Sequence, residues 1–492
     1  MNITTIVLMI IFVFIFIPLV IAEVTRAKFR WTLEDFFLQS RTMPLIMAFF
    51  TIYATWVSSF AFLGSTKSFF QEGPLYMTSF AWNVLFAVLF YLVGRRIWYY
   101  GKSRGYITAT DFFDDIYRNR LLSLSVTIII AVFTIPYLVI QLYGGAFLIE
   151  TVSNGLIPWK AAGLLFYLVI IIYLWAGGLR AVALADIYYG ILTFVTMLIA
   201  GVALIQEVDG PRNAFQTILS KEDGYCTLGG LGDSNSVLMW LAMFLVIPIG
   251  AFMGPPIWIR MYSIANQKIF KILPLLLAII PIMYMGPLLA GITAKYLYPN
   301  VEASDNLLVM MIMEKLPIIM AVVILCGIAA ASLSTANSQI QAMAAIYAID
   351  IHRRYINPKV KERQLLNVGK WAVLAVSVAA YMLILFSSGS IVEIGTLSFS
   401  GTMQIFVPTV GALAWDKSNS KAAFVGVWVG TITSLVCWWI LKYPTVYAAI
   451  IGFIFNIVLF VVFSLILPEN SDVKNRIVMY KNEFAENIGN EQ

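Results

Sequence analysis

Apolar segments of about twenty residues recur along almost the whole chain, and they constrain the fold more than any other feature. A segment of that length crosses the hydrocarbon core of a bilayer as a helix, whereas a membrane β-strand needs about ten residues of alternating polarity. Hydrophobic residues make up 61% of the 492 residues, and charged residues only 12%. A soluble domain carries about a quarter charged residues. The sequence therefore predicts an all-α polytopic membrane protein with about thirteen transmembrane helices.

The predicted spans share a high apolar content over a membrane-spanning length. They run near 3–23, 44–70, 75–97, 121–150, 159–176, 183–206, 236–258, 270–296, 316–350, 367–387, 391–414, 421–441 and 444–467.

Basic residues lie mainly in alternate loops, and this asymmetry predicts the orientation. With the N-terminus outside, the inner loops hold Arg95, Arg96, Arg353 and Arg354 among others, while the outer loops hold few lysines and arginines. Cytoplasmic loops of membrane proteins are enriched in this way. We therefore expect a multi-pass protein of the cell (plasma) membrane, with an extracellular N-terminus and a cytoplasmic C-terminus. These loops account for the formal net charge of +6, so no nucleic-acid partner is expected.

The sequence argues against an enzyme. The three cysteines (Cys226, Cys326 and Cys437) are far apart, and the one histidine, His352, lies in a basic loop. The chain therefore shows no nucleophile–histidine pair, metal cluster or glycine-rich phosphate loop. Neither a disulfide framework nor a zinc site is expected.

Two of the predicted spans are interrupted by polar residues, glycine or proline. The second span contains the polar stretch 55–67, and the seventh contains glycines and prolines within 248–256. They lie five spans apart and run in opposite predicted directions, as the first helices of two inverted five-helix repeats would. A proline kink alone would explain the seventh span, but paired broken helices indicate a solute site at the bilayer midplane.

This pattern divides the chain into six parts. They are an extra N-terminal helix with a cytoplasmic loop (1–43), a first repeat (44–206), an extracellular loop (207–235), a second repeat (236–414), two C-terminal helices (415–467) and a cytoplasmic tail (468–492).

The ninth span carries an unusual density of hydroxyl and amide side chains, ASLSTANSQ at 331–339. Polar groups in hydrocarbon are costly unless protein, water or an ion satisfies them. Hydroxyl oxygens are ligands that hard cations accept, so the run is consistent with a cation site. Close helix packing explains small and hydroxylated residues equally well. The run alone leaves both interpretations open.

Three motifs resemble those of the sodium:solute symporter family. The segment GGLRAVALAD at 177–186 is similar to the family signature between the fifth and sixth spans. The segment STANSQ at 334–339 is similar to the signature of the ninth span, and PIWIRMY at 256–262 to the segment that closes the seventh. The resemblance extends over nearly the whole chain. It implies a leucine-transporter-type core, in which spans two to six and seven to eleven form the inverted five-plus-five helix repeat.

The resemblance also implies one sodium site between the second and ninth spans. Its ligands would be the backbone carbonyls of Ala54, Val57 and Ala331 and the hydroxyls of Ser334 and Thr335. Elementary chemistry agrees with this set, because a broken helix exposes carbonyls and residues spaced i, i+3 and i+4 share one helix face. Five neutral oxygens suit a monovalent ion better than a divalent one.

A second sodium site near Asp186 is not expected. Ala185 and Tyr189 stand where the family signature has threonine and glutamine. We expect Asp186 to be structural, pairing with Arg180 or capping the sixth span. Lys67 is expected near the outer mouth, where the nearby Glu72 could pair with it.

The same resemblance implies a solute cavity beside the ion, between the broken helices and the fourth and eleventh spans. The candidate solute-binding residues are Trp56, Ser58, Ser59, Tyr137, Gln141, Thr402 and Gln404. The pattern PYxxxQLxG at 136–144 is most similar to the pantothenate and monocarboxylate branch. Trp56 stands where proline-transporting members have an acidic residue, which argues against proline. A carboxylate could be held by amides at a broken helix N-terminus and by hydroxyls.

These features predict a sodium-coupled secondary active symporter that imports a small organic anion by alternating access, with a monomer sufficient for transport. One alternative is symport of an amino acid such as proline, or of a sugar or sialic acid. A membrane solute sensor acting through a partner protein is a second, and coupling to protons is a third.

Overall fold

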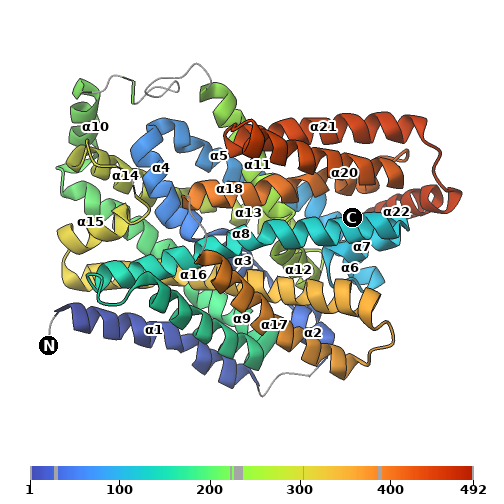
Figure 1. Ribbon diagram of the computed structural model, residues 1–492, viewed down its shortest axis with the longest axis horizontal. Coiled ribbons are helices and arrows are strands. Elements are labelled where there is room, and N and C mark those ends of the chain that lie inside the picture. Colours follow the sequence, from blue (N-terminus) through green and yellow to red (C-terminus); the bar gives the residue numbers. More distant parts are fainter. Residues whose placement is uncertain are drawn as a thin grey trace.

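The computed structural model describes residues 3–26, 32–221, 224–225, 236–302, 304–385 and 390–489, and every regular element in them is helical. Helices of opposite direction pack side by side along one common axis (Figure 1). The predicted loop 207–235 is described only in part, since 222–223 and 226–235 lie outside these residues, as does Cys226. The other two cysteines are buried free thiols.

The helices account for the predicted spans. Among the described residues, ten helices are long and apolar enough to cross a membrane, and two bent helix pairs each pass the same criterion together. The shorter apolar helix Trp159–Trp175 coincides with the remaining predicted span. The predicted all-α polytopic fold is therefore confirmed.

Spans two to six are built from eight helical segments. They are α3 (Leu45–Trp56), η2 (Phe60–Gly64) and α4 (Ser65–Glu72), then α5 (Thr78–Leu89), η4 (Phe90–Gly94) and α6 (Arg95–Arg104), then α8 (Arg120–Val152) and the kinked α9 (Trp159–Gln206), which holds the fifth and sixth spans.

Spans seven to eleven follow in the same order. They are α11 (Ser236–Phe252) and α12 (Pro255–Ser263), then α13 (Ile269–Leu277), η5 (Ile280–Tyr284) and α14 (Met285–Leu297), then α16 (Ile318–Ala345) with η6 (Ile346–Ile356), α17 (Glu362–Ile384), and α18 (Ile391–Thr402), η7 (Met403–Ile405) and α19 (Phe406–Ala414).

The remaining elements surround this core. The outer spans are α1 (Ile3–Arg26), α20 (Ser420–Leu435) with η8 (Val436–Ile440), and α21 (Thr445–Ile466). The connecting elements are α2 (Leu33–Leu38), η1 (Gln39–Arg41), η3 (Gly73–Met77), α7 (Ala109–Tyr117), α10 (Gly210–Lys221), α15 (Leu307–Lys315) and the C-terminal α22 (Ser471–Gly489).

The helix α16 is the centre of the bundle. Every residue from Ile324 to Ala345 is buried, including the polar run at 331–339. The helix packs against α8 and α9 along its length and against α3, α12 and α17 over shorter stretches. The sequence alone does not say whether the polar side chains at 331–339 face lipid or protein. In the structure they all face protein.

Both interrupted spans are broken helices. The axes of α3 and the segment Phe60–Glu72 differ by 60°, and those of α11 and α12 differ by 55°. The first break occurs at Val57, whose backbone is extended (φ −86°, ψ 111°), and the chain resumes helical hydrogen bonding at Ser58. The second occurs at Gly254, which precedes Pro255 and Pro256, residues that cannot donate to the preceding turn.

The glycine pair of the motif at 177–186 has a backbone role. Gly178 has φ +54° and ψ −153°, a conformation essentially restricted to glycine, and it makes the kink between the fifth and sixth spans. An added Cβ there would lie 2.9 Å from the carbonyl oxygen of Phe36 in α2. Two residues further on, Arg180 pairs with the buried Asp35 at 2.7 Å. The motif therefore anchors α2 against the kink.

Two predicted side-chain pairings are wrong. Arg180 pairs with Asp35 and not with Asp186, because the kink at Gly178 turns it toward α2. Lys67 pairs at 3.3 Å with Asp305, which precedes α15, and not with the nearby Glu72. In both cases the partner comes from a segment distant in the sequence.

Candidate ion and solute site

The break in the second span is held against α16 by Thr335. The Thr335 hydroxyl lies 3.1 Å from the carbonyl oxygen of Ala54, 3.3 Å from that of Thr55 and 3.5 Å from that of Val57. Carbonyls in the last turn of a helix lack intrahelical donors, because the chain beyond them leaves the helix. A single hydroxyl on α16 therefore meets three backbone oxygens of the broken helix.

The other predicted ion ligands lie on the same buried stretch of α16. The Ser334 hydroxyl bonds to the carbonyl oxygen of Ala331 at 3.2 Å, and both residues are buried. The oxygens gathered here are neutral, and the described residues contain no group of three or more histidine, cysteine or acidic side chains that could hold a metal. Neutral hydroxyl and carbonyl oxygens fit a monovalent hard cation.

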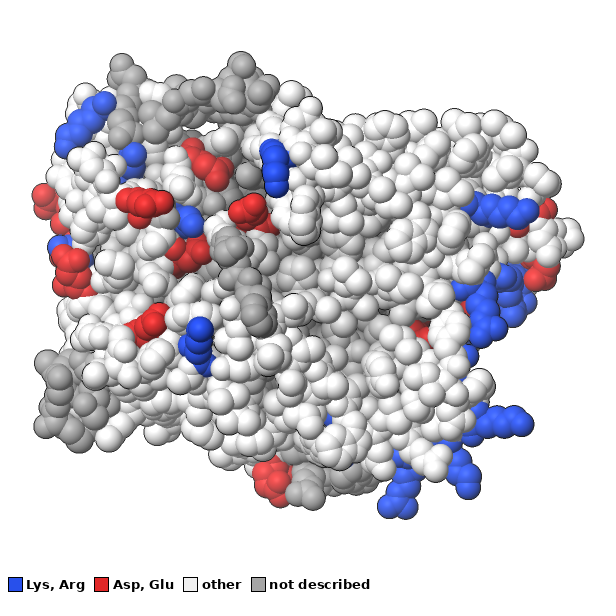
Figure 2. Space-filling view, viewed as in Figure 1, with Lys and Arg blue, Asp and Glu red and all other residues white. Residues whose placement is uncertain are grey.

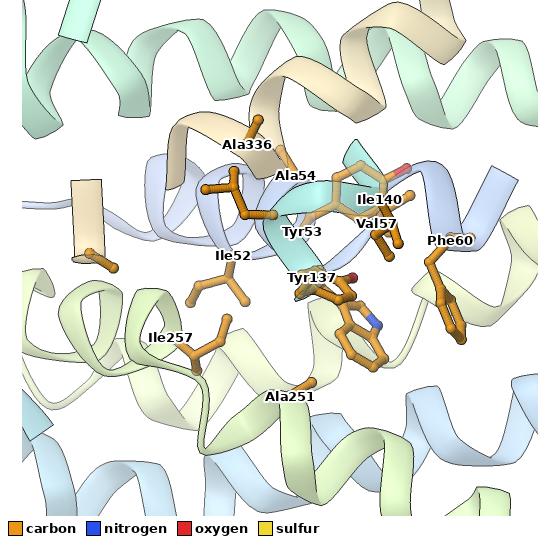
Figure 3. Packing of buried hydrophobic residues seen from close by; sticks show 14 of the residues in the cluster. Ile52, Tyr53, Ala54, Val57, Phe60, Tyr137, Ile140, Ala251, Ile257 and Ala336 are labelled. Carbon is orange, nitrogen blue, oxygen red and sulfur yellow. The ribbon is translucent and has the colours of Figure 1, made fainter. Parts of the chain in front are cut away.

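A small cavity lies beside this break. Its volume is about 30 Å³, and both broken helices, α8, α16 and α18 line it. Figure 3 shows part of its apolar wall, with Ile257 facing Ile52 and with Ala251 below Tyr137. A solute pocket usually measures about 300–1,000 Å³, so the cavity is contracted here to the size of a few waters.

Three of the predicted solute residues line this cavity, namely Trp56, Tyr137 and Thr402. The Trp56 indole donates to Asn83 at 2.5 Å and stacks on Phe86. The Thr402 hydroxyl donates to the carbonyl of Gly250 in the other broken helix at 2.8 Å. These contacts hold the aromatic and hydroxyl walls in place.

Ser58, Ser59 and Gln141 lie behind the wall. The Ser58 hydroxyl bonds to that of Tyr137 at 3.0 Å. The Gln141 amide accepts from the backbone N–H of Ser59 at 3.2 Å and donates to the carbonyl of Tyr137. Gly144 allows this approach, since a Cβ there would lie 2.2 Å from the Ser59 hydroxyl. These residues brace the broken helix and do not line the cavity.

Gln404 lies away from the cavity. Its amide nitrogen bonds to the Ser400 carbonyl and the Ser434 hydroxyl, and its oxygens accept from Asn456 of α21. The physical reason is the local 3₁₀ turn at 403–405, which directs this side chain toward the two C-terminal spans.

Two cavity residues were missed by the sequence analysis. Thr134 and Gln339 both line the cavity, and each has a buried oxygen without a hydrogen-bond partner among the described residues. Helical spacing could have identified them, because Thr134 stands three residues before Tyr137 and Gln339 four after Thr335. Unpartnered buried oxygens are costly, so these two are the cavity atoms most in need of a ligand.

A buried ionic network lies next to the ion site. The carboxylate of Asp186 accepts from Thr51 at 2.5 Å and pairs with Arg260 at 3.5 Å, and both charged side chains are fully buried. Arg260 also donates to Ser338, whose hydroxyl bonds to Thr55 at 2.9 Å. The network therefore joins α3, α9, α12 and α16, and it gives Asp186 the structural role that was expected with a different partner.

Two broken helices in corresponding positions, an ion-sized cluster of neutral oxygens and an adjoining cavity define a class of protein. They are the features of a leucine-transporter-type secondary transporter, and not of an enzyme. The comparisons with known proteins agree. Residues 36–430 match the model of the sodium:solute symporter family, so the chain belongs to that family, and sodium is its coupling ion.

The chain is also similar to individual members of the family. It is 25% identical over 411 residues to the sodium/pantothenate symporter of Escherichia coli, covering 81% of this chain and 83% of the relative. It is 25% identical over 384 residues to the osmoregulated proline transporter OpuE of Bacillus subtilis, and the match covers 75% of this chain and 76% of the relative. A structure of a Na⁺-coupled sialic acid symporter in a substrate-bound outward-open state superposes with a TM-score of 0.81 at 18% identity, over 95% of this chain and 99% of that one.

Thr335→Ala should weaken sodium binding, because it removes the hydroxyl that meets the carbonyls of Ala54 and Val57. Sodium stabilises the folded protein in proportion to its binding, so thermal unfolding at increasing sodium concentration measures the affinity without a known solute. We expect the half-maximal sodium concentration to rise about 10-fold or more, the effect of losing about 1.4 kcal/mol. Thr335→Ser should retain most of the affinity.

The control is Thr293→Ala, which removes a buried threonine hydroxyl bonded only within α14. A Thr335→Ala protein with the same sodium dependence as this control would show that the ion binds elsewhere.

Asp186→Asn should destabilise the protein strongly, because it leaves the charge of Arg260 buried without its partner. Breaking a buried ion pair from one side costs about 3–5 kcal/mol, whereas replacing both partners costs less. The unfolding midpoint should therefore fall most for the single variant and recover in part when Arg260→Gln is added. The half-exposed pair Arg104–Glu483 supplies the control, since Glu483→Gln should cost about 1 kcal/mol or less. Additive losses in the double variant would contradict the pairing.

Proposed function

We propose that this symporter imports a small organic anion, of the monocarboxylate or pantothenate type, together with sodium by alternating access. A single chain would carry out transport in the plasma membrane, with the N-terminus outside and the C-terminus in the cytoplasm. The sodium ligands would be the carbonyls of Ala54, Val57 and Ala331 and the hydroxyls of Ser334 and Thr335.

One observation supports the coupling of sodium binding to solute binding. The stretch of chain from Ala54 to Val57 presents carbonyls to Thr335, and the same stretch supplies Thr55 and Trp56 to the cavity wall. An ion bound to these carbonyls would hold the wall of the cavity in place, and a solute in the cavity would hold the carbonyls. Each ligand thereby favours binding of the other, which is the reciprocity that coupled transport needs.

The position of Gln339 adds an electrostatic argument for an anion. Gln339 stands four residues after Thr335 on α16, a rise of about 6 Å. A carboxylate about 6 Å from a bound sodium ion would be attracted by about 3 kcal/mol at an effective dielectric constant of about 20. No charged side chain of the described residues lines the cavity, and the buried Arg260 nearby is paired with Asp186. A bound sodium ion would therefore supply an uncompensated positive charge for an anion.

The donors for the anion differ from those expected from sequence. Backbone amides at the start of the resumed second span are already engaged, since Ser59 donates to Gln141 and Phe60 donates to Ser58. The helix α12 begins with two prolines, which have no N–H to offer. The hydroxyls of Thr134 and Tyr137 and the amide of Gln339 would bind the solute instead.

The distribution of charge supports the proposed orientation. Lys and Arg side chains gather at the right-hand end of the molecule in Figure 2, and the acidic side chains visible in this view lie mostly toward the left. The right-hand end is the end at which α6, α7 and α22 lie in Figure 1. An excess of basic residues marks the cytoplasmic side.

Uptake into liposomes tests the proposal directly. Purified protein in liposomes should accumulate a radiolabelled organic acid only when sodium is higher outside, and an inward sodium flux should accompany it. Symport of one sodium ion with one monovalent anion moves no net charge, so the membrane potential adds nothing. A sodium gradient of about tenfold then supports accumulation of about tenfold. Binding without uptake would instead support a sensor. Uptake driven equally by a proton gradient would overturn sodium coupling.

Competition identifies the solute class. Pantothenate, a monocarboxylate, proline and sialic acid should each be tested as unlabelled competitors at one concentration. Stronger competition by pantothenate or the monocarboxylate than by proline would support the anion proposal, and stronger competition by proline would reject it.

Thr134→Val should weaken solute binding and leave sodium binding unchanged. The substitution keeps the shape and removes the unpartnered hydroxyl. We expect the solute concentration for half-maximal uptake to rise about 5- to 10-fold, as the loss of one hydrogen bond predicts. Thr431→Val, whose hydroxyl bonds only within α20, is the matched control. Equal behaviour of the two variants would exclude Thr134 from the solute site.

A further inference from the structure

Two further cavities lie at the hairpin between α20 and α21, and they share no lining residue with the cavity at the broken helices. The first cavity, of about 430 Å³, is lined by Glu393 at the start of α18 and by Trp438, Trp439, Lys442 and Tyr443 of the hairpin. We call it the hairpin cup. The second, of about 400 Å³, is an apolar groove between α11 and α21, lined by Leu241, Leu245 and Ile450 among others. The four helices α11, α18, α20 and α21 lie together in the upper part of Figure 1.

The two cavities adjoin at Tyr443, which lines both. The cup is therefore a polar and aromatic head to a groove with apolar walls. The turn that shapes it is held by backbone bonds from Leu441 to Val436 and from Tyr443 to Cys437, and Lys442 between them has φ +58°. These contacts project Lys442 from a fixed backbone rather than from a loose loop.

The cup carries one charge of each sign. The side chains of Glu393 and Lys442 are both exposed, and neither forms an ion pair within the described part of the chain. The two tryptophan rings stand nearly perpendicular, at 87° with centroids 5.8 Å apart. Tryptophan faces attract ammonium groups, a carboxylate attracts their positive charge, and a lysine binds phosphate.

We propose that the hairpin cup and the groove bind a phospholipid whose zwitterionic headgroup carries an ammonium. The ammonium would lie against Glu393 and the tryptophans, the phosphate against Lys442, and one acyl chain along the groove between α11 and α21. Tryptophan, tyrosine and lysine at a helix end are the residues found at the headgroup level of a bilayer. The proposal is independent of which solute is transported.

The position of the groove gives the bound lipid a mechanical role. One wall is α11, the first half of the second broken helix, whose far end at Gly250 and Ala251 lines the solute cavity. The other wall is α21, outside the inverted repeats. A lipid held between them would bind most tightly to the α11 position that gives this groove, and would favour that state of the transporter.

Short-chain lipids test the site in the full-length protein. Delipidated protein in detergent would be titrated with dioctanoyl phosphatidylethanolamine, phosphatidylcholine and phosphatidylglycerol, and with glycerophosphoethanolamine, which has the headgroup but no acyl chains. The rise in unfolding midpoint with concentration gives each affinity. We expect the two zwitterionic lipids to bind about 10-fold more tightly than phosphatidylglycerol, the effect of the ammonium contacts. The chain-free headgroup should bind weakest, because it gains nothing from the groove.

Variants assign the roles within the site. Glu393→Gln should reduce the affinity for the zwitterionic lipids to that for phosphatidylglycerol and leave the latter unchanged. Lys442→Met should weaken binding of all three lipids. Leu245→Asn should also weaken binding of all three, to the same extent, because it places a polar side chain in the groove. Lys421→Met, at the opposite end of α20, is the matched control. The sodium-induced rise in midpoint, measured on each variant, checks that it is folded.

Two results would overturn the proposal. Equal affinity for all three lipids, or unchanged affinities in both Glu393→Gln and Lys442→Met, would show that the cup does not select a headgroup. Tight binding of glycerophosphoethanolamine would show that the cup takes a soluble ligand and that the groove is not part of the site.

Discussion

The break in the second span is the constraint on which the rest of the site depends. A helix that ends at Trp56 inside a membrane leaves carbonyls that water cannot satisfy, and each would cost several kcal/mol if left bare. In this protein one hydroxyl, that of Thr335, meets three of them. A hydroxyl has one proton to donate, so Thr335 satisfies one of these carbonyls at a time. The broken helix therefore packs against α16 with carbonyl oxygens left over, which a bound cation would take up.

The buried network beside the site adds a second constraint on the same helices. Arg260 and Asp186 neutralise each other in a position with no exposure to solvent. The Thr51 hydroxyl donates to Asp186 and accepts from Arg260, and the Ser338 hydroxyl accepts from Arg260. Ser338 also bonds to Thr55, so the network reaches the broken helix from α16 as Thr335 does, three residues further along. The segment that would change position during transport is thus held by two hydroxyls of α16, and each bond can be exchanged for one to water or an ion at little net cost.

The sequence was sufficient for the spans and the two breaks, and the family resemblance brought Thr335 together with the broken helix. The spans and the breaks follow from local rules, namely apolar length and the placement of polar residues, glycine and proline. The pairing of Asp186 with Arg260 does not follow from such a rule, because the two residues lie in different helices. The nearer Arg180 is turned away from Asp186 by the kink at Gly178 and pairs with Asp35. The orientation of Gln141 and Gln404 could not be predicted from a local rule either. The same sequence pattern allows an amide on a buried helix to face a cavity or a neighbouring helix.

The contraction of the cavity links these constraints to transport. A space of about 30 Å³ cannot hold a solute, yet it contains unpartnered oxygens of Thr134 and Gln339. Buried polar atoms without partners make the contracted arrangement unfavourable by about 1–3 kcal/mol each. A solute whose carboxylate accepts from Thr134 and whose other groups donate to the Gln339 oxygen would remove this cost, but only by moving apart the two broken helices that line the space. Part of the free energy of solute binding would then offset the displacement of α12, which is linked to α16 by the hydrogen bond from Arg260 to Ser338. In the proposed function, the solute and the ion would act on the same helix contacts from opposite ends of one turn of α16, and this shared set of contacts would couple them.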